Sequence, residues 1–158
     1  MNRGSRNRSW WLVLLALNLA LIWGNSLLPG TESAKLSRWV SEIFAGLFGT
    51  ESLGGISGEG LLRKAAHFAE FACLGMLLTQ ILIKREKKNR APVIPALLGC
   101  LLAACLDETI QIFVVGRGSS LLDVWIDFSG AAVGMMILLI GHYVFTSKNL
   151  QHKTEETT

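Results

Sequence analysis

The sequence predicts an all-α integral membrane protein with four transmembrane helices, and three observations support this. Of its 158 residues, 51% are hydrophobic and only 17% are charged, against about 25% charged residues in soluble domains. The mean hydropathy is +0.42. Four segments approach the roughly 20 apolar residues that a spanning helix needs. This composition excludes a disordered chain and a disulfide-stapled secreted module, and it disfavours an ordinary soluble enzyme.

The four spans are expected at residues 10–28, 61–83, 91–115 and 121–145. The first follows a stretch with three arginines and ends at Pro29 and Gly30. A signal peptide has the same pattern, but no clean small-x-small cleavage site follows, so we expect a retained helix. The three cysteines all lie inside apolar runs, where cysteine behaves as a small hydrophobic residue.

The basic residues predict the orientation of the chain. Ten of the 15 Lys and Arg residues lie in segments 1–9, 84–90 and 147–158. Short basic flanks of spans stay on the cytoplasmic side. We therefore expect a cytoplasmic N-terminus (1–9), a membrane domain (10–146) and a cytoplasmic polar tail (147–158) in a multi-pass protein of the cell membrane. Residues 29–60 and 116–120 then face outward. The basic residues form no stripe with aromatic residues, so no nucleic-acid partner is expected.

A short amphipathic helix is expected over residues 35–48 of the first outer loop. Apolar residues recur there at helical spacing, namely Leu36, Val40, Ile43, Phe44 and Leu47. Charged residues fill the other face, namely Lys35, Arg38 and Glu42. The helix either lies in the outer interface of the membrane or packs on the mouth of the bundle.

Polar residues inside three spans are the strongest sign of function, because ionisable groups are costly in a membrane. They are Arg63, Lys64, His67 and Glu70 in the second span, Asp107, Glu108 and Gln111 in the third, and Asp123 and Asp127 in the fourth. With a third span that ends at Val115, its polar groups lie roughly 6–12 Å below the outer end, and those of the fourth about 3–9 Å below it. All three spans thus contribute to one band in the outer leaflet.

Spacing orients these residues within each helix. Arg63, His67 and Glu70 share one face of the second span. Asp107 and Gln111 are four residues apart, as are Asp123 and Asp127. Gly130 and Gly134 continue the last row, as a small-xxx-small surface on which helices pack closely. The aspartates of the fourth span are therefore expected to point into the bundle.

The charges of this band do not cancel. Five acidic residues face three basic ones, Arg63, Lys64 and Arg117. A low-dielectric pocket resists a net charge, so either a carboxylate is protonated or a cation is bound. The alternative is a self-neutralising network that only holds the helices together.

The segments RKAAHFAEFACLG (63–75) and LDETIQIFVVGRGSSLLDVWIDFSGAAVG (106–134) resemble the VanZ-like family of bacterial membrane proteins. The positions that match its motifs are Lys64, His67, Glu70, Phe71, Asp107, Glu108, Gln111, Arg117, Asp123, Gly130 and Gly134. One departure is Asp127, where family members often carry Asn. The resemblance covers about residues 10–145. It implies a role in the cell envelope, because the founding member is associated with resistance to the lipoglycopeptide teicoplanin.

Several functions remain open at this point. An enzyme acting on a lipid or lipid-linked phosphate headgroup would draw its catalytic candidates from His67, Glu70, Asp107 and Glu108. Its substrate-binding candidates are Arg63, Lys64, Gln111, Arg117, Asp123 and Asp127. Asp107, Glu108 and Asp123 are instead the candidates for holding a divalent cation, since oxygen ligands suit magnesium; the sequence leaves open whether any metal or cofactor is bound. The alternatives are a non-catalytic protein that binds membrane lipids, a lipid-linked cell-wall precursor or a lipoglycopeptide, a proton-coupled carrier, and a purely structural network.

Overall fold

Four helices of the computed structural model are long and apolar enough to cross a membrane, as the sequence predicts. The structure describes residues 3–48, 56–85 and 93–155. Its helices are α1 (Arg3–Ser26), α2 (Gly30–Phe48), α3 (Ile56–Arg85), α4 (Val93–Ile112) and α5 (Leu121–Glu155). The candidate spans are Ser9–Leu27, Gly60–Lys84, Val93–Ile112 and Leu121–Ser147. The all-helical fold class is therefore confirmed for the described residues.

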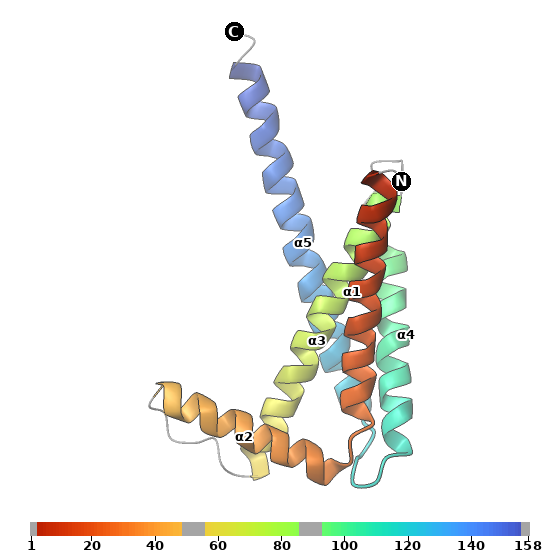
Figure 1. Cartoon of the computed structure of the whole chain (residues 1–158), viewed down its shortest axis with the longest axis vertical. Coiled ribbons are helices and arrows are strands. Elements are labelled where there is room, and N and C mark those ends of the chain that lie inside the picture. The colour runs from red at the N-terminus through yellow and green to blue at the C-terminus, as the bar shows by residue number, and fades with distance from the viewer. Residues whose placement is uncertain (1–2, 49–55, 86–92, 156–158) are drawn as a thin grey trace.

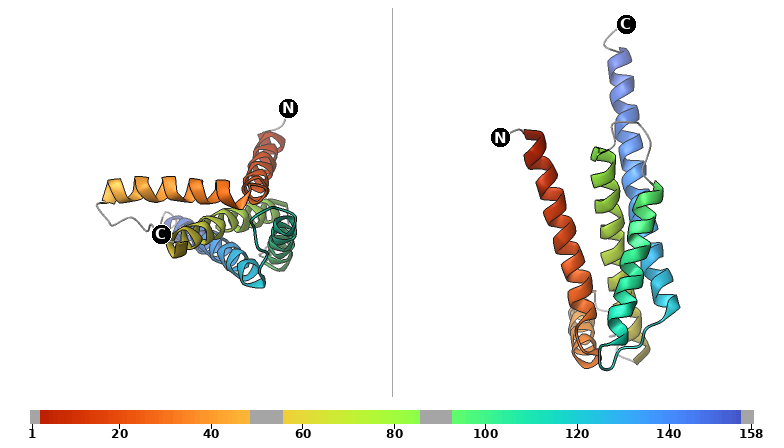
Figure 2. Two further views of the ribbon diagram at one scale, coloured as in Figure 1. Left: turned by 90° about the horizontal axis from the view of Figure 1, so that it is seen from below. Right: turned by 90° about the vertical axis from the view of Figure 1, so that its right-hand side faces the viewer.

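The four spans alternate in direction, so that α1 begins and α5 ends at the same end of the bundle (Figure 1). The central helix is α3, which packs against each of the other four. Figure 2 shows that α1 meets the other spans at the opposite end and diverges from them toward its N-terminus. Which end faces the cytoplasm stays a prediction from the basic residues.

The core lies where the four spans converge, and small side chains keep it narrow. Ile22 of α1 packs against Phe71 and Leu74 of α3, with Cys100 of α4 and Ala131 of α5 completing the cluster. Large apolar side chains point outward along α1, α4 and α5, for example Leu17, Leu98 and Ile137. This inside-out distribution suits a lipid environment, where an exposed leucine is in contact with other hydrocarbon.

The amphipathic helix α2 lies across the end of the bundle, at a steep angle to the spans (Figure 1). It begins at Gly30, five residues before the predicted start. The reason is that Pro29 already takes part in the first turn, since its carbonyl accepts from the amide of Ser33. The helix touches α3, while Trp39 is 60% exposed and Ile43 41% exposed. Part of α2 therefore packs on the bundle and part extends beyond it. Leu36, Phe44 and Leu47 lie outside the residues whose side chains are described.

The predicted end of the third span at Val115 is wrong, because α4 ends at Ile112. The amides of Phe113 and Val114 each turn back to a carbonyl three residues earlier, which tightens and ends the helix. Gly116 then takes a positive φ of 75°, a conformation that suits glycine. The polar residues of α4 consequently lie only about 2–8 Å from the end of the helix.

Backbone contact between α3 and α5 is the closest packing in the bundle. A Cβ atom at Gly130 would overlap the carbonyl of Phe68, and one at Gly134 would overlap that of Ala72. A Cβ atom at Gly75, on the α3 side, would overlap Ala131 in the same way. The row of glycines in α5 thus lies against α3 with no side chain between the two backbones.

We expect Gly134→Ala to destabilise the bundle by about 1–3 kcal/mol, the usual cost of overpacking, because α3 and α5 must separate to admit the methyl group. Thermal unfolding of the purified protein in detergent measures this loss. Gly141→Ala is the matched control, since nothing lies within 4 Å of a Cβ atom at that position of the same helix. Equal unfolding temperatures for the two variants would contradict the close contact.

Candidate functional site

Polar side chains from four helices meet at the end of the bundle where α2 lies. The buried ones are Ser26 of α1, His67 of α3, Asp107, Glu108 and Gln111 of α4, and Asp127 of α5. Apart from Ser26, all were expected from the sequence. The structure therefore gathers the predicted polar residues of three spans into one cluster and adds a fourth helix to it.

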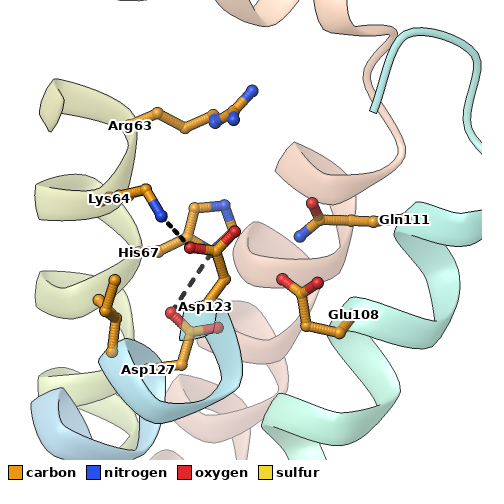
Figure 3. A pocket seen from close by; sticks show the side chains of 8 residues that line it. Arg63, Lys64, His67, Glu108, Gln111, Asp123 and Asp127 are labelled. Atoms are coloured by element: carbon orange, nitrogen blue, oxygen red, sulfur yellow. Dashed lines mark hydrogen bonds and ion pairs between the residues drawn. The ribbon is translucent and has the colours of Figure 1, made fainter. Parts of the chain in front are cut away.

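A pocket opens above this cluster between α3, α4 and α5 (Figure 3). Its lining residues are Arg63, Lys64, His67, Glu108, Gln111, Asp123, Ile126 and Asp127. Seven of these eight residues are polar or charged. Arg63 stands above the others, Lys64 lies beside Asp123, and Asp127 lies below them (Figure 3).

The two basic residues of the pocket differ in their pairing. Lys64 forms an ion pair with Asp123 across the gap between α3 and α5. Arg63 extends over the pocket (Figure 3) and is half-buried. No carboxylate of the described residues lies within ion-pair distance of it. Of the two basic residues of the pocket, Arg63 is thus the one without an ion-pair partner in the described part of the chain.

His67 stands between two buried carboxylates at the base of the pocket. Its Nδ1 lies 3.7 Å from Oδ2 of Asp107 and 3.9 Å from Oδ1 of Asp127. The three residues are 7%, 0% and 1% exposed. These distances exceed hydrogen-bond length, so the groups face one another without direct bonds. Their ligand-type atoms all lie within 4.8 Å of one another, the arrangement that can hold a metal ion.

Asp107 is held in place by two neighbours. The hydroxyl of Ser26 donates to Oδ2 of Asp107 at 2.8 Å, and the amide of Gln111 donates to the same oxygen at 2.8 Å. Because both donors reach Oδ2, the other oxygen, Oδ1, is left without a partner in the described structure.

The first span supplies polar groups that the sequence analysis missed. The side chain of Asn18 donates to the backbone carbonyl of Glu70 at 3.3 Å, and that of Asn25 donates to its Oε1 at 3.5 Å. Ser26 follows Asn25 and reaches Asp107. The sequence contained an indication of this polar face, because Asn18 and Asn25 are seven residues apart and share one face of an otherwise apolar helix.

Glu70, predicted as a catalytic candidate, is turned away from the pocket and toward α1. Its Oε1 accepts from Asn25, and it is absent from the residues that line the pocket. The three-residue spacing from His67 placed Glu70 on the same face of the helix, but α1 packs against that face at Glu70. Its contacts join α1 to α3.

Arg117, predicted as a substrate-binding residue, caps helix α1. Its guanidinium donates to the carbonyl of Asn25 at 2.6 Å and to that of Leu28 at 3.1 Å, which satisfies carbonyls at the helix C-terminus. Burial, reinforced by the charge of Arg63, lowers the pKa of Arg117 from its ordinary value. A guanidinium nevertheless stays protonated in proteins, so the cap is cationic.

Glu108 and Asp123, two of the three predicted metal ligands, have other partners. Oε2 of Glu108 accepts from the amide of Ser120 at 2.8 Å, just before α5 begins. Ser120 caps that helix, since its hydroxyl accepts from the amide of Leu122 at 3.2 Å. With Asp123 paired to Lys64, only Asp107 of the predicted set belongs to the group that can hold an ion.

Comparison with known proteins gives one match. The family model described as VanZ/LLP1 matches residues 10–142. No curated protein and no solved structure matches the chain. The matched region contains every polar residue of the pocket. It also contains the four candidate spans, apart from Ser9 and the last few residues of the fourth span.

We expect Arg117→Ala to loosen the junction between α1 and α2. Charge-assisted hydrogen bonds contribute about 1.5–3 kcal/mol, and the amide of Gly30 bonds to the carbonyl of Val115 beside them. Hydrogen exchange at residues 25–35 and 113–120 should therefore accelerate. Ser119→Ala, an exposed change in the same loop, is the control. Exchange at the wild-type rate in the Arg117 variant would rule out the capping role.

Ser26→Ala should lower stability by about 1–3 kcal/mol, because it removes a donor from the fully buried carboxylate of Asp107. Ser129→Ala is a suitable comparison, since the hydroxyl of Ser129 is exposed and bonds only to the carbonyl of Trp125 in its own helix. Thermal unfolding in detergent separates the two. The hydrogen bond between α1 and α4 would be unimportant if both variants unfolded at the same temperature.

Proposed function

The chain belongs to the VanZ/LLP1 family and is a multi-pass membrane protein, and we propose that it binds the phosphate of a lipid or lipid-linked headgroup in the outer leaflet of the cell membrane. The observation that carries the proposal is Arg63, a half-buried guanidinium over the pocket without an ion-pair partner among the described residues. Guanidinium groups bind phosphate through two parallel hydrogen bonds.

The position of the pocket suits a lipid headgroup. It lies at the end of the spans, beside the helix that crosses the bundle (Figure 1), so a ligand can keep its acyl or prenyl chains in the membrane. α1 begins and α3 ends at the other end of the bundle (Figure 1), and in the sequence these two helix ends carry the basic flanks 1–9 and 84–90. By the positive-inside rule we expect that end to be cytoplasmic, which supports a pocket in the outer leaflet.

Chemistry on the headgroup is supported by the groups beneath Arg63. An imidazole between two carboxylates is an arrangement that general acid–base catalysis uses, and His67 and Asp127 both line the pocket. A protein that only holds the headgroup, such as one that organises cell-wall precursors or reduces the binding of a teicoplanin-type lipoglycopeptide, needs Arg63 but not this arrangement. The cluster therefore favours an enzyme over a protein that only holds the headgroup.

A proton-coupled carrier is disfavoured by where the buried polar groups lie. Of the buried polar side chains in the described residues, Thr79 alone lies in the half of the spans remote from the pocket. A transport path needs polar groups along its whole length. In the described helices, the buried polar groups other than Thr79 lie near one end of the spans.

The test is a binding measurement with two phosphorylated probes, dioctanoyl phosphatidic acid and farnesyl phosphate, against dioctanoylglycerol and farnesol. Calorimetry on the full-length protein in detergent should show binding of the phosphorylated probes only. Arg63→Gln should weaken that binding at least about tenfold, equivalent to about 1.4 kcal/mol. The two probes also distinguish a glycerophospholipid from a polyprenyl phosphate.

Arg38→Gln is the matched control, because Arg38 is exposed on α2 and lies outside the pocket. It removes the same charge from the same end of the molecule. The proposal fails if neither phosphorylated probe binds, or if both arginine variants lose affinity equally, which would indicate only general attraction to a basic surface.

A further inference from the structure

Three buried atoms at the base of the pocket have no hydrogen-bond partner in the described structure. They are Nδ1 of His67, Oδ1 of Asp107 and Oδ2 of Asp127. Buried polar atoms are normally paired, and an unpaired one is costly, most of all when it carries charge. All three belong to side chains whose ligand-type atoms lie within 4.8 Å of one another, so one group bound between these side chains could serve as a partner for all three.

The cationic side chains nearby are used elsewhere or lie too far away. Lys64 is paired with Asp123, and Arg117 donates to the carbonyls of Asn25 and Leu28. No ion pair of the described residues joins Arg63 to Asp107 or Asp127. Two carboxylates with a neutral imidazole leave a formal charge of about −2, which a divalent cation would cancel.

We propose that His67, Asp107 and Asp127 bind a divalent first-row transition metal, of the Zn²⁺ or Mn²⁺ class. Imidazole favours such ions over magnesium and calcium, which take oxygen ligands. Zinc binds nitrogen and oxygen at about 2.0–2.2 Å, which puts neighbouring ligand atoms about 3–3.6 Å apart. Nδ1 of His67 is 3.7 Å from Oδ2 of Asp107 and 3.9 Å from Oδ1 of Asp127, and the ligand-type atoms of all three residues lie within 4.8 Å of one another. A movement of up to about 1 Å, with rotation of the carboxylates, would bring them into this range.

The surroundings of Asp107 support this assignment. Metal-ligating carboxylates are themselves oriented by hydrogen bonds from a second shell of residues. Ser26 and Gln111 provide such bonds to Oδ2, and they come from two different helices. This holds the carboxylate beside His67 and leaves Oδ1 without a hydrogen-bond partner in the described structure. No other carboxylate of the pocket is held in this way by two side chains in the described structure.

Three protein ligands leave at least one coordination position for another molecule, as in catalytic rather than structural zinc sites. That position would face the pocket, because His67 and Asp127 line it (Figure 3). The site differs from the predicted set of Asp107, Glu108 and Asp123 in two of its three ligands. It does not depend on headgroup binding, since the argument uses only the buried atoms beneath the pocket.

The test measures the metal alone. Full-length protein, freed of any affinity tag and of metal by a chelator, is titrated in detergent with Zn²⁺, Mn²⁺ and Mg²⁺, followed by elemental analysis after desalting. The wild type should retain about one Zn²⁺ or Mn²⁺ per chain, and bound metal should raise its unfolding temperature. His67→Ala should weaken binding at least about 100-fold, the upper range for losing even a second-shell residue.

Two matched controls locate the site. His142→Ala removes a histidine that is exposed in the far half of α5. Asp123→Ala removes a carboxylate one helical turn from Asp127, and it should keep the metal that Asp127→Ala loses. Size-exclusion profiles show that each variant is folded.

The proposal is overturned if the wild type retains no more metal than His67→Ala, or if Mg²⁺ binds in preference to both other ions. Equal loss of metal in the Asp123 and Asp127 variants would overturn the assigned ligands. Failure here leaves headgroup binding unaffected, because that binding is tested through Arg63, which is not one of the three metal ligands.

Discussion

The direct backbone contact between α3 and α5 is the constraint on which the site depends. Gly130 lies against the carbonyl of Phe68, and Gly134 lies one turn further along against Ala72. His67 is the residue before Phe68, and Asp127 stands one turn before Gly130. The glycine row therefore fixes the distance between the imidazole and the carboxylate. A larger residue in the row would move the two groups apart even though it touches neither.

A second constraint acts at the end of the bundle, where loops join the spans. Arg117 binds the last carbonyls of α1, while Glu108 binds the amide of Ser120 at the start of α5. Two ionisable residues of the predicted site thus hold the helix ends that surround the pocket. Backbone groups at helix ends need partners in a membrane protein. The charged side chains of Arg117 and Glu108 supply such partners and so help to fix the shape of the pocket.

The remaining polar residues lie at different levels of the pocket, with the basic side chains of Arg63 and Lys64 above His67 and Asp127 (Figure 3). The proposed binding of a phosphate and the proposed binding of a metal therefore rest on different side chains. Asp107 lies deeper, fixed by Ser26 and Gln111. One helix, α4, thereby links the base of the pocket to α1.

The sequence alone determined the four spans, the amphipathic helix between the first two and the membership of most of the polar cluster, because hydropathy and helical spacing are local properties. It also indicated the close face at Gly130 and Gly134. Only the tertiary structure decided the roles of Glu70, Glu108, Arg117 and Asp123, whose partners lie in other elements. The same holds for Ser26, whose partner is 81 positions away. Spacing within a helix fixes the direction of a side chain, but the neighbour it meets depends on how the helices pack.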